Sequence, residues 1–159
     1  MIVYHGSTIK VDSPDAGHSK RFLDFGVGFY ITADKAQAEG WAKRKSVRLN
    51  ANPIVNIYNL SDELSAYNTL VFKEEDGAWL DFVAQCRKGN EVYKDYDYIS
   101  GSVANDDVFV TVDMYVRSIW DRERALSEIR YYKTSHQICL LSQALIDNEL
   151  KFDGCYEVK

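Results

Sequence analysis

Two stretches decide the fold of this chain: Val3-Tyr4-His5-Gly6-Ser7 and, after a long loop, Asp24-Phe25-Gly26-Val27-Gly28-Phe29-Tyr30. The hydrophobic pattern predicts a first strand over 2–5 and a second strand over 28–32. The residues from Ser7 to Gly28 are rich in Ser, Asp and Gly. A structureless loop of about 20 residues in a compact domain is usually functional. We therefore expect this loop to border a site.

Helices and strands alternate irregularly along the rest of the chain. We expect helices from Asp34 to about Ser46, over 75–87, from Asp106 or Asp107 onward and over 121–131, with a helical turn over 142–147. Further strands are expected over 54–60, 96–99, 137–141 and 150–157. Because no regular βαβ order is present, the sequence predicts an α+β fold. The length of 159 residues fits a single domain.

Composition predicts a protein of the cytoplasm. The chain is 46% hydrophobic and 27% charged, as in soluble globular proteins, and no stretch approaches the roughly 18 apolar residues of a membrane span. The first five residues lack the features of a signal peptide. Three cysteines without CxxC spacing favour free thiols in a reducing compartment. We expect neither a metal nor a membrane partner.

The charge distribution leaves one question open. A net charge of −5 disfavours a general nucleic-acid binder. Five cations nevertheless crowd one segment, namely Lys35, Lys43, Arg44, Lys45 and Arg48. A solvated helix face explains them, and a local contact with an anionic partner is the alternative.

The motifs for common nucleotide and hydrolase sites are absent: no GxGxxG opens a helix, and the sequence has no P-loop, GxSxG or HExxH. The ordered set His5-Gly6-Ser7, Gly28-Phe29-Tyr30 and Trp41 resembles the ADP-ribosyltransferase superfamily, in particular its poly(ADP-ribose) polymerase-like branch with a His-Tyr-Glu triad. The chain is most similar to a group of small bacterial proteins of unknown function in that superfamily. That likeness rests on almost the whole chain, through the two opening stretches, Trp79 to Val83, Val103 to Val108 and Gln137-Ile138-Cys139.

The resemblance implies a split β-sheet core that binds NAD as a co-substrate. It assigns NAD binding to His5, Gly6, Ser7, Tyr30 and Trp41. Physical chemistry supports these roles, since two aromatic faces suit the flat cationic nicotinamide ring. A glycine backbone lets a carboxamide approach closely, and His5 can hydrogen-bond a ribose hydroxyl.

The triad implied by the resemblance is His5, Tyr30 and Gln137, with Gln in place of the usual Glu. A carboxylate would stabilise the oxocarbenium-like charge of the transition state, and an amide carries no such charge. Replacing Gln137 by Glu is therefore expected to raise nicotinamide release by about ten-fold or more. A carboxylate from Asp106 or Asp107 could compensate, although helix capping explains those residues equally well.

The resemblance favours a mono-ADP-ribosyltransferase, acting as an intracellular bacterial toxin with a small antitoxin protein as partner. Its macromolecular acceptor, protein or nucleic acid, is left open. An NAD glycohydrolase is the enzymatic alternative. A non-catalytic module that binds NAD or ADP-ribose is the alternative that Gln137 motivates. An interaction protein whose aromatic residues are all core is the simplest one.

Overall fold

The computed structural model describes residues 1–19, 23–104, 106–131 and 135–159, apart from the side chains of Asp106 and Asp107. Any contribution of those two carboxylates therefore lies outside the described residues. The secondary structure elements in chain order are β1 (Ile2–Ser7), β2 (Phe29–Ile31), α1 (Lys35–Leu49), β3 (Ile54–Leu60), β4 (Thr69–Val71), α2 (Gly77–Arg87), the 3-10 helix η1 (Val92–Asp95), β5 (Tyr98–Val103), α3 (Asp106–Val116), α4 (Arg122–Ile129), β6 (Ser135–Leu140), α5 (Gln143–Glu149) and β7 (Leu150–Glu157).

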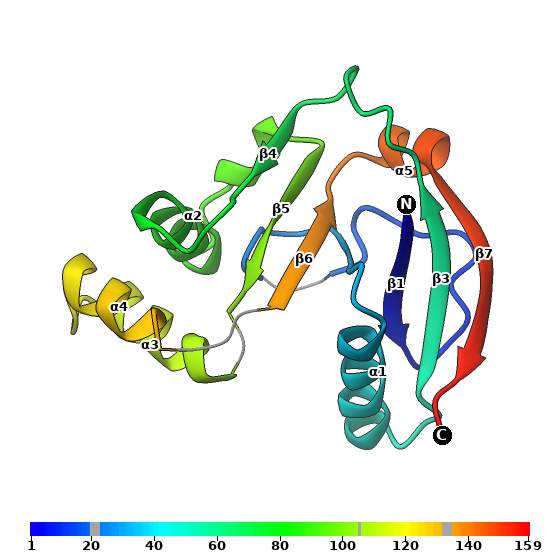
Figure 1. Ribbon diagram of the computed structural model, residues 1–159, viewed down its shortest axis with the longest axis horizontal. Helices are drawn as coiled ribbons and strands as arrows, with labels where there is room; N and C mark the ends of the chain where they lie inside the picture. Colours follow the sequence, from blue (N-terminus) through cyan, green and yellow to red (C-terminus); the bar gives the residue numbers. More distant parts are fainter. Residues whose placement is uncertain (20–22, 105, 132–134) are drawn as a thin grey trace.

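The strands form two sheets that lie side by side (Figure 1). One sheet has the order β1-β3-β7 and is antiparallel throughout. The other has the order β2-β6-β5-β4, with only β4 and β5 parallel. Tyr4 and Thr32 exchange two backbone hydrogen bonds of 2.8 and 2.9 Å and so join the sheets where β1 meets β2. The predicted α+β class is confirmed. The bridge also brings β1, which carries His5, next to the end of β2, which carries Tyr30.

Helix starts follow the side chains that can cap them. Asp34, Asp76, Asp121 and Ser142 each accept a hydrogen bond from a backbone N–H in the first turn of the following helix, which satisfies donors that have no partner within the helix. Asn50, a residue with left-handed backbone angles, caps the C-terminal end of helix α1. The cap at Asp34 therefore fixes the start of α1, the helix that carries Trp41, shortly after the end of β2.

Two elements were not predicted. Strand β4 has only three residues, too few for an alternating pattern, and it forms because it can pair with β5 at the edge of the sheet. The turn η1 is equally short. Strand β5 spans Tyr98–Val103 rather than 96–99, because Gly101 and Ser102 continue its ladder with β6.

Three groups of buried side chains hold the layers together. The first fills the space between the two sheets and includes Val3, Phe29, Tyr58 and Leu140. The second packs α2, α3 and α4 against the four-stranded sheet, with Trp79 fully buried at its centre. The third joins α1 to β1 and β3. Helices α1 and α3 thereby stand on opposite sides of the region where β6 begins (Figure 1).

The long loop after β1 is fixed to the three-stranded sheet by a buried asparagine. Asn56 Oδ1 accepts from Val11 N at 2.8 Å, and Asn56 Nδ2 donates to Ile9 O at 3.1 Å. Tyr58 donates its hydroxyl to Val11 O as well. Buried polar side chains of this kind satisfy backbone groups that no strand partner reaches. The loop can thus run over the sheet and present its later residues to a site.

Two further predictions from composition bear on the fold. All three cysteines are free, with Cys86 and Cys139 buried and Cys155 exposed. In the part of the chain that the structure describes, no helix is long and apolar enough to cross a membrane.

Candidate functional site

Two adjoining cavities open between α1, α3 and the start of β6. The first has a volume of about 500 Å³ and the second about 610 Å³, both within the range of about 300–1,000 Å³ typical of small-molecule sites. They share His5, Leu23, Tyr30, Trp41 and Lys45. The two cavities therefore form one continuous depression rather than separate sites.

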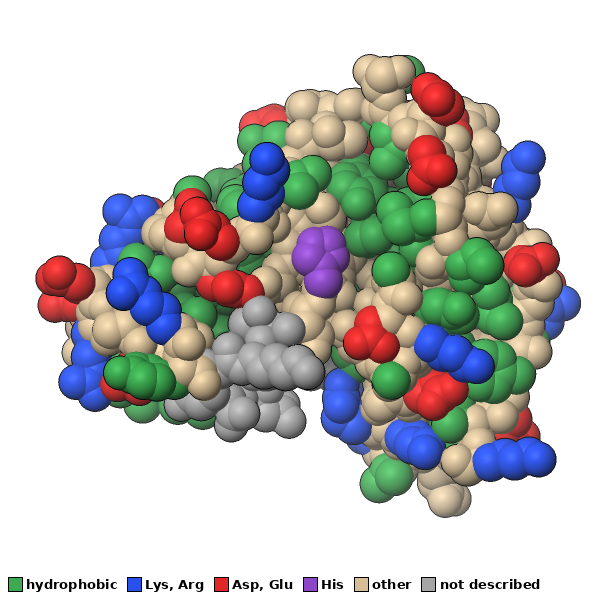
Figure 2. All heavy atoms as spheres, viewed as in Figure 1, with side chains coloured by type: hydrophobic (Ala, Val, Ile, Leu, Met, Phe, Trp, Pro, Cys, Tyr) green, Lys and Arg blue, Asp and Glu red, His purple; other side chains and the backbone are tan. Residues whose placement is uncertain are grey.

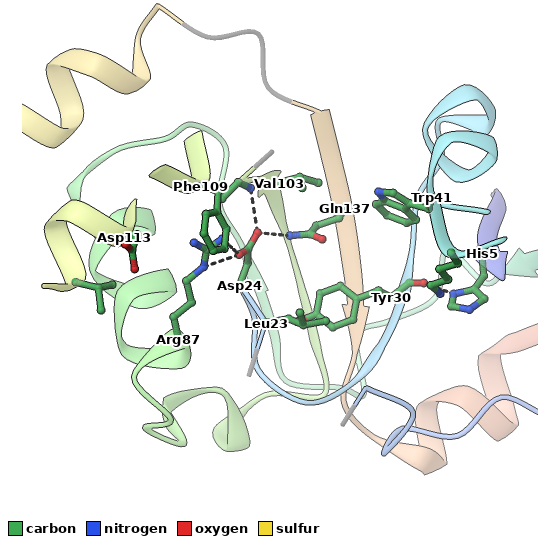
Figure 3. A pocket seen from close by; sticks show the side chains of 13 residues that line it. His5, Leu23, Asp24, Tyr30, Trp41, Arg87, Val103, Phe109, Asp113 and Gln137 are labelled. Carbon is green, nitrogen blue, oxygen red and sulfur yellow. Dashed lines mark hydrogen bonds and ion pairs between the residues drawn. The ribbon is translucent and has the colours of Figure 1, made fainter. Parts of the chain in front are cut away.

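The structure brings most of the predicted site residues together. His5, Tyr30, Trp41 and Gln137 all line the first cavity (Figure 3). Ser7 is buried at the end of β1 and does not line either cavity. These four residues, from β1, β2, α1 and β6, thus meet at one cavity. Stacking of Tyr30 and Trp41 on a nicotinamide ring stays a prediction.

His5 lines the cavity and has one ring nitrogen without a hydrogen-bond partner among the described residues. Its Nδ1 lies 2.7 Å from Tyr30 O, and because a carbonyl only accepts, Nδ1 must carry the proton. Burial, followed by the charge of Lys45, lowers the pKa of His5 to about 3. The ring is therefore neutral at physiological pH, and Nε2 is an unprotonated acceptor. Nε2 is buried and has no partner among the described residues, so a ligand hydroxyl could satisfy it.

Tyr30 is anchored rather than free to move. Its hydroxyl donates to Gly26 O at 2.8 Å and accepts from Phe25 N at 3.1 Å. Burial raises the pKa of Tyr30 well above its usual value, so the hydroxyl stays protonated. The ring is consequently a fixed surface of the cavity, and its hydroxyl holds the glycine-rich segment that precedes β2.

Gly6 is required for a different reason from the expected one. A Cβ at this position would lie 2.2 Å from Ala38 O and 2.8 Å from Trp41 Cβ, so glycine is needed to let α1 pack on β1. Because Tyr4 pairs with Thr32, the alternation of the strand turns the N–H and C=O of Gly6 away from β3 as well. The carbonyl accepts from Lys45 Nζ at 2.7 Å. Gly6 is itself buried and lines neither cavity.

Gln137 belongs to a buried polar group that we call the Asp24 network: Asp24, Arg87, Gln137 and the backbone N–H of Ala104. Asp24 Oδ2 accepts from Gln137 Nε2 at 3.1 Å and from Ala104 N at 2.9 Å. Asp24 Oδ1 accepts from Arg87 Nη2 at 2.6 Å. Asp24 and Gln137 are only 7% and 5% exposed. The carboxylate is thus fully engaged, and the amide oxygen of Gln137 lies on the side away from Asp24 (Figure 3).

The second cavity carries positive charge. We call its cationic border the α1 side, defined by Arg44, Lys45 and Arg48. Among the residues that the structure describes, these three side chains make no ion pair within 4.0 Å. Burial, and then the charge of Arg48, lowers the pKa of Lys45 to about 8. In Figure 2, Lys and Arg side chains gather over the part of the molecule where Figure 1 places α1.

The opposite border comes from α3. Phe109, Asp113 and Val116 lie on one face of that helix and line the first cavity. The Phe109 ring covers the guanidinium of Arg87, whose central carbon is 4.5 Å from the ring centroid. This contact shields the Asp24 network from solvent on one side.

Sequence reasoning missed three residues of the site. The motif that contains Asp24 indicates no role for this residue, and the local charge pattern favours a solvated helix face for Lys45. That interpretation is wrong for Lys45, which is partly buried, and right for the exposed Lys43. The spacing of four residues from Trp41 to Lys45 would have placed both on one helix face. Arg87 gave no signal, because only the tertiary fold brings α2 to Asp24.

Comparison with known proteins finds a family match. No curated protein and no solved structure matches the chain. Residues 1–152 match the family described as "Protein of unknown function (DUF3990)". Because this match covers nearly the whole sequence, the chain belongs to the DUF3990 family.

Proposed function

We propose that this protein is an NAD-dependent mono-ADP-ribosyltransferase. The observation that carries the proposal is the meeting of His5, Tyr30, Trp41 and Gln137 around one cavity that continues into a cationic one. An intracellular toxin role with a small antitoxin protein as partner is part of the proposal and rests on the resemblance alone.

The two cavities suit the two ends of a dinucleotide. The aromatic rings and the amide and imidazole acceptors of the first cavity fit a nicotinamide ring and its ribose hydroxyls. The unpaired cations of the α1 side fit a diphosphate. His5 Nε2, buried without a partner, can accept from a ribose hydroxyl. NAD would thus lie across the shared residues, with its phosphates toward α1.

In the reaction, NAD supplies an ADP-ribosyl group to a nucleophile. The bond between nicotinamide and ribose breaks, and its electron pair leaves with nicotinamide. The acceptor forms the new bond to the same ribose carbon and releases its proton to solvent. His5 and Gln137 orient the ribose by accepting hydrogen bonds, and Tyr30 and Trp41 hold the ring. Orientation of this kind can supply a large part of a rate enhancement.

A second candidate function is NAD binding without transfer. It is favoured by one observation: the only described carboxylate in contact with Gln137 belongs to Asp24, which is already paired with Arg87. The network therefore offers little net negative charge to a developing cation. Such a protein would bind NAD or ADP-ribose and release no nicotinamide.

The test is incubation of the purified protein with NAD labelled in its adenine ring, with and without cell lysate. We expect free nicotinamide together with label on a macromolecule, which protease or nuclease treatment then assigns to protein or nucleic acid. Trp41→Ala should weaken NAD binding by about 1–2 kcal/mol. Trp120→Ala, which removes a Trp that lines neither cavity, is the matched control.

The outcomes separate the candidates. Nicotinamide release without labelled macromolecule indicates a glycohydrolase, and binding without release indicates the second candidate. If calorimetry detects no NAD binding, or if Trp41→Ala and Trp120→Ala bind NAD equally well, the proposed site is wrong.

A further inference from the structure

We propose that Asp24, held by Arg87, is a positioning residue that fixes the orientation of the Gln137 amide. Because of Asp24, the site requires an uncharged side chain at position 137. The inference rests on the proposed function for its catalytic consequence. Its structural basis is the Asp24 network, which spans the loop before β2, the end of α2 and the start of β6.

The chemistry of the network determines which way the amide points. The Asp24 carboxylate is paired with Arg87 and accepts from Ala104 N, so it presents only acceptors. An amide oxygen facing it would leave two acceptors in contact. The NH2 group of Gln137 must therefore face Asp24, as the 3.1 Å contact shows. Its oxygen is consequently directed away from the network, where it can accept from a ligand hydroxyl.

Arg87, at the end of α2, keeps the Asp24 carboxylate in place. Its Nε and Nη2 both donate to Asp24 Oδ1, at 3.0 and 2.6 Å, and these charge-assisted bonds hold that oxygen in place. Ala104 N holds the other oxygen. Asp24 thus has no freedom to turn away from Gln137. The network acts on the ligand only through the amide of Gln137, and for this reason we class Asp24 as positioning rather than catalytic.

The geometry reverses the expectation for Gln137→Glu. The new carboxylate would lie against Asp24 Oδ2, where the present contact is 3.1 Å. Two carboxylates at hydrogen-bond distance cannot both ionise readily, so the substitution would add a protonated acid rather than a negative charge. Nicotinamide release should then fall. Asp24→Asn in the same molecule removes the repulsion and lets the introduced carboxylate ionise.

The experiment compares nicotinamide release by Gln137→Glu, Asp24→Asn and the molecule carrying both changes. We expect each single change to lower release, by up to about ten-fold, and the combination to exceed both single variants by about ten-fold. The matched control is Gln143→Glu. Gln143 also donates its Nε2 to an aspartate, Asp147, at 2.8 Å, but on an exposed surface. This change should leave release unaltered.

A second readout does not depend on NAD. The carboxyl introduced by Gln137→Glu can be titrated by NMR with labelled glutamate. We expect its proton affinity to be at least about ten-fold higher than that of the carboxyl introduced by Gln143→Glu, because of Asp24. Adding Asp24→Asn should abolish the excess. This result distinguishes the inference from the proposed function, since it holds even if wild-type protein releases no nicotinamide.

The proposal is overturned if Gln137→Glu alone raises nicotinamide release ten-fold, or if its carboxyl titrates like the one at the exposed control position. Additive effects of the two changes on release would also overturn it. Should Asp24→Asn fail to fold, Gln137→Glu alone still decides, because it leaves the Asp24–Arg87 pair intact.

Discussion

The α1 side and the Asp24 network border the same depression in opposite electrostatic states. On the α1 side, three cations lie within one helix and have no anionic partner among the described residues. In the network, an anion and a cation from distant segments already form an ion pair, at 2.6 Å. Cations without partners can gain from an anionic ligand, whereas a paired network resists change. One border is therefore suited to attract a ligand and the other to orient it.

The largest expected effect concerns the stability of the network. Asp24→Asn leaves Arg87 buried without its counter-charge, and breaking a buried pair typically costs about 3–5 kcal/mol. The control is Asp81→Asn, which removes the carboxylate of another ion pair, the one with Arg122 at 2.7 Å. The two side chains of that pair are about half exposed. Exposed pairs contribute roughly 0–1 kcal/mol. Urea denaturation of both variants tests the difference.

Equal losses in the two variants would show that the Asp24–Arg87 pair contributes no more than a surface contact. The contrast between the two borders would then be one of position and not of energy.

A somewhat smaller effect is expected where α1 rests on β1. Gly6→Ala would place a Cβ 2.2 Å from Ala38 O and 2.7 Å from Ala42 N, and overpacking of this kind costs about 1–3 kcal/mol. Gly40→Ala, within α1, is the control, since the nearest atom to its new Cβ is the flexible Arg44 Nη1 at 3.6 Å. Alanine at that helical position should stabilise the protein by up to about 1 kcal/mol.

Thermal unfolding measures both changes. A Gly6→Ala variant as stable as wild type would mean that α1 can shift on β1, and the cationic border would then be less fixed than the network.

The residues that line the cavity from β1 to α1 and the residues of the Asp24 network also differ in how far the sequence could predict them. His5, Tyr30 and Trp41 lie within one strand–loop–strand–helix segment, so local pattern and resemblance were sufficient to place them near one another. Gln137 was placed correctly beside the cavity through the strand that pairs with β2. Its partner Asp24 could not be found, because that contact spans 113 residues and depends on how β6 crosses the molecule. Short edge elements such as β4 were missed because pairing, and not their own residues, stabilises them.

The smallest expected effect is the dependence of NAD binding on pH through Lys45. Its pKa of about 8 in the free protein is below the usual value because of burial and Arg48. A bound diphosphate favours the ammonium form and so raises that pKa. Affinity should therefore be constant below pH 8 and fall about ten-fold as the pH rises above it, since binding must then be accompanied by proton uptake. Lys45→Arg keeps its charge and should remove this decline, and Lys45→Met should bind weakly at every pH. Calorimetry from pH 6 to 10 measures all three proteins. Identical pH profiles for wild type and Lys45→Arg would show that the phosphates do not reach the α1 side, and would leave the aromatic cavity as the whole of the NAD site.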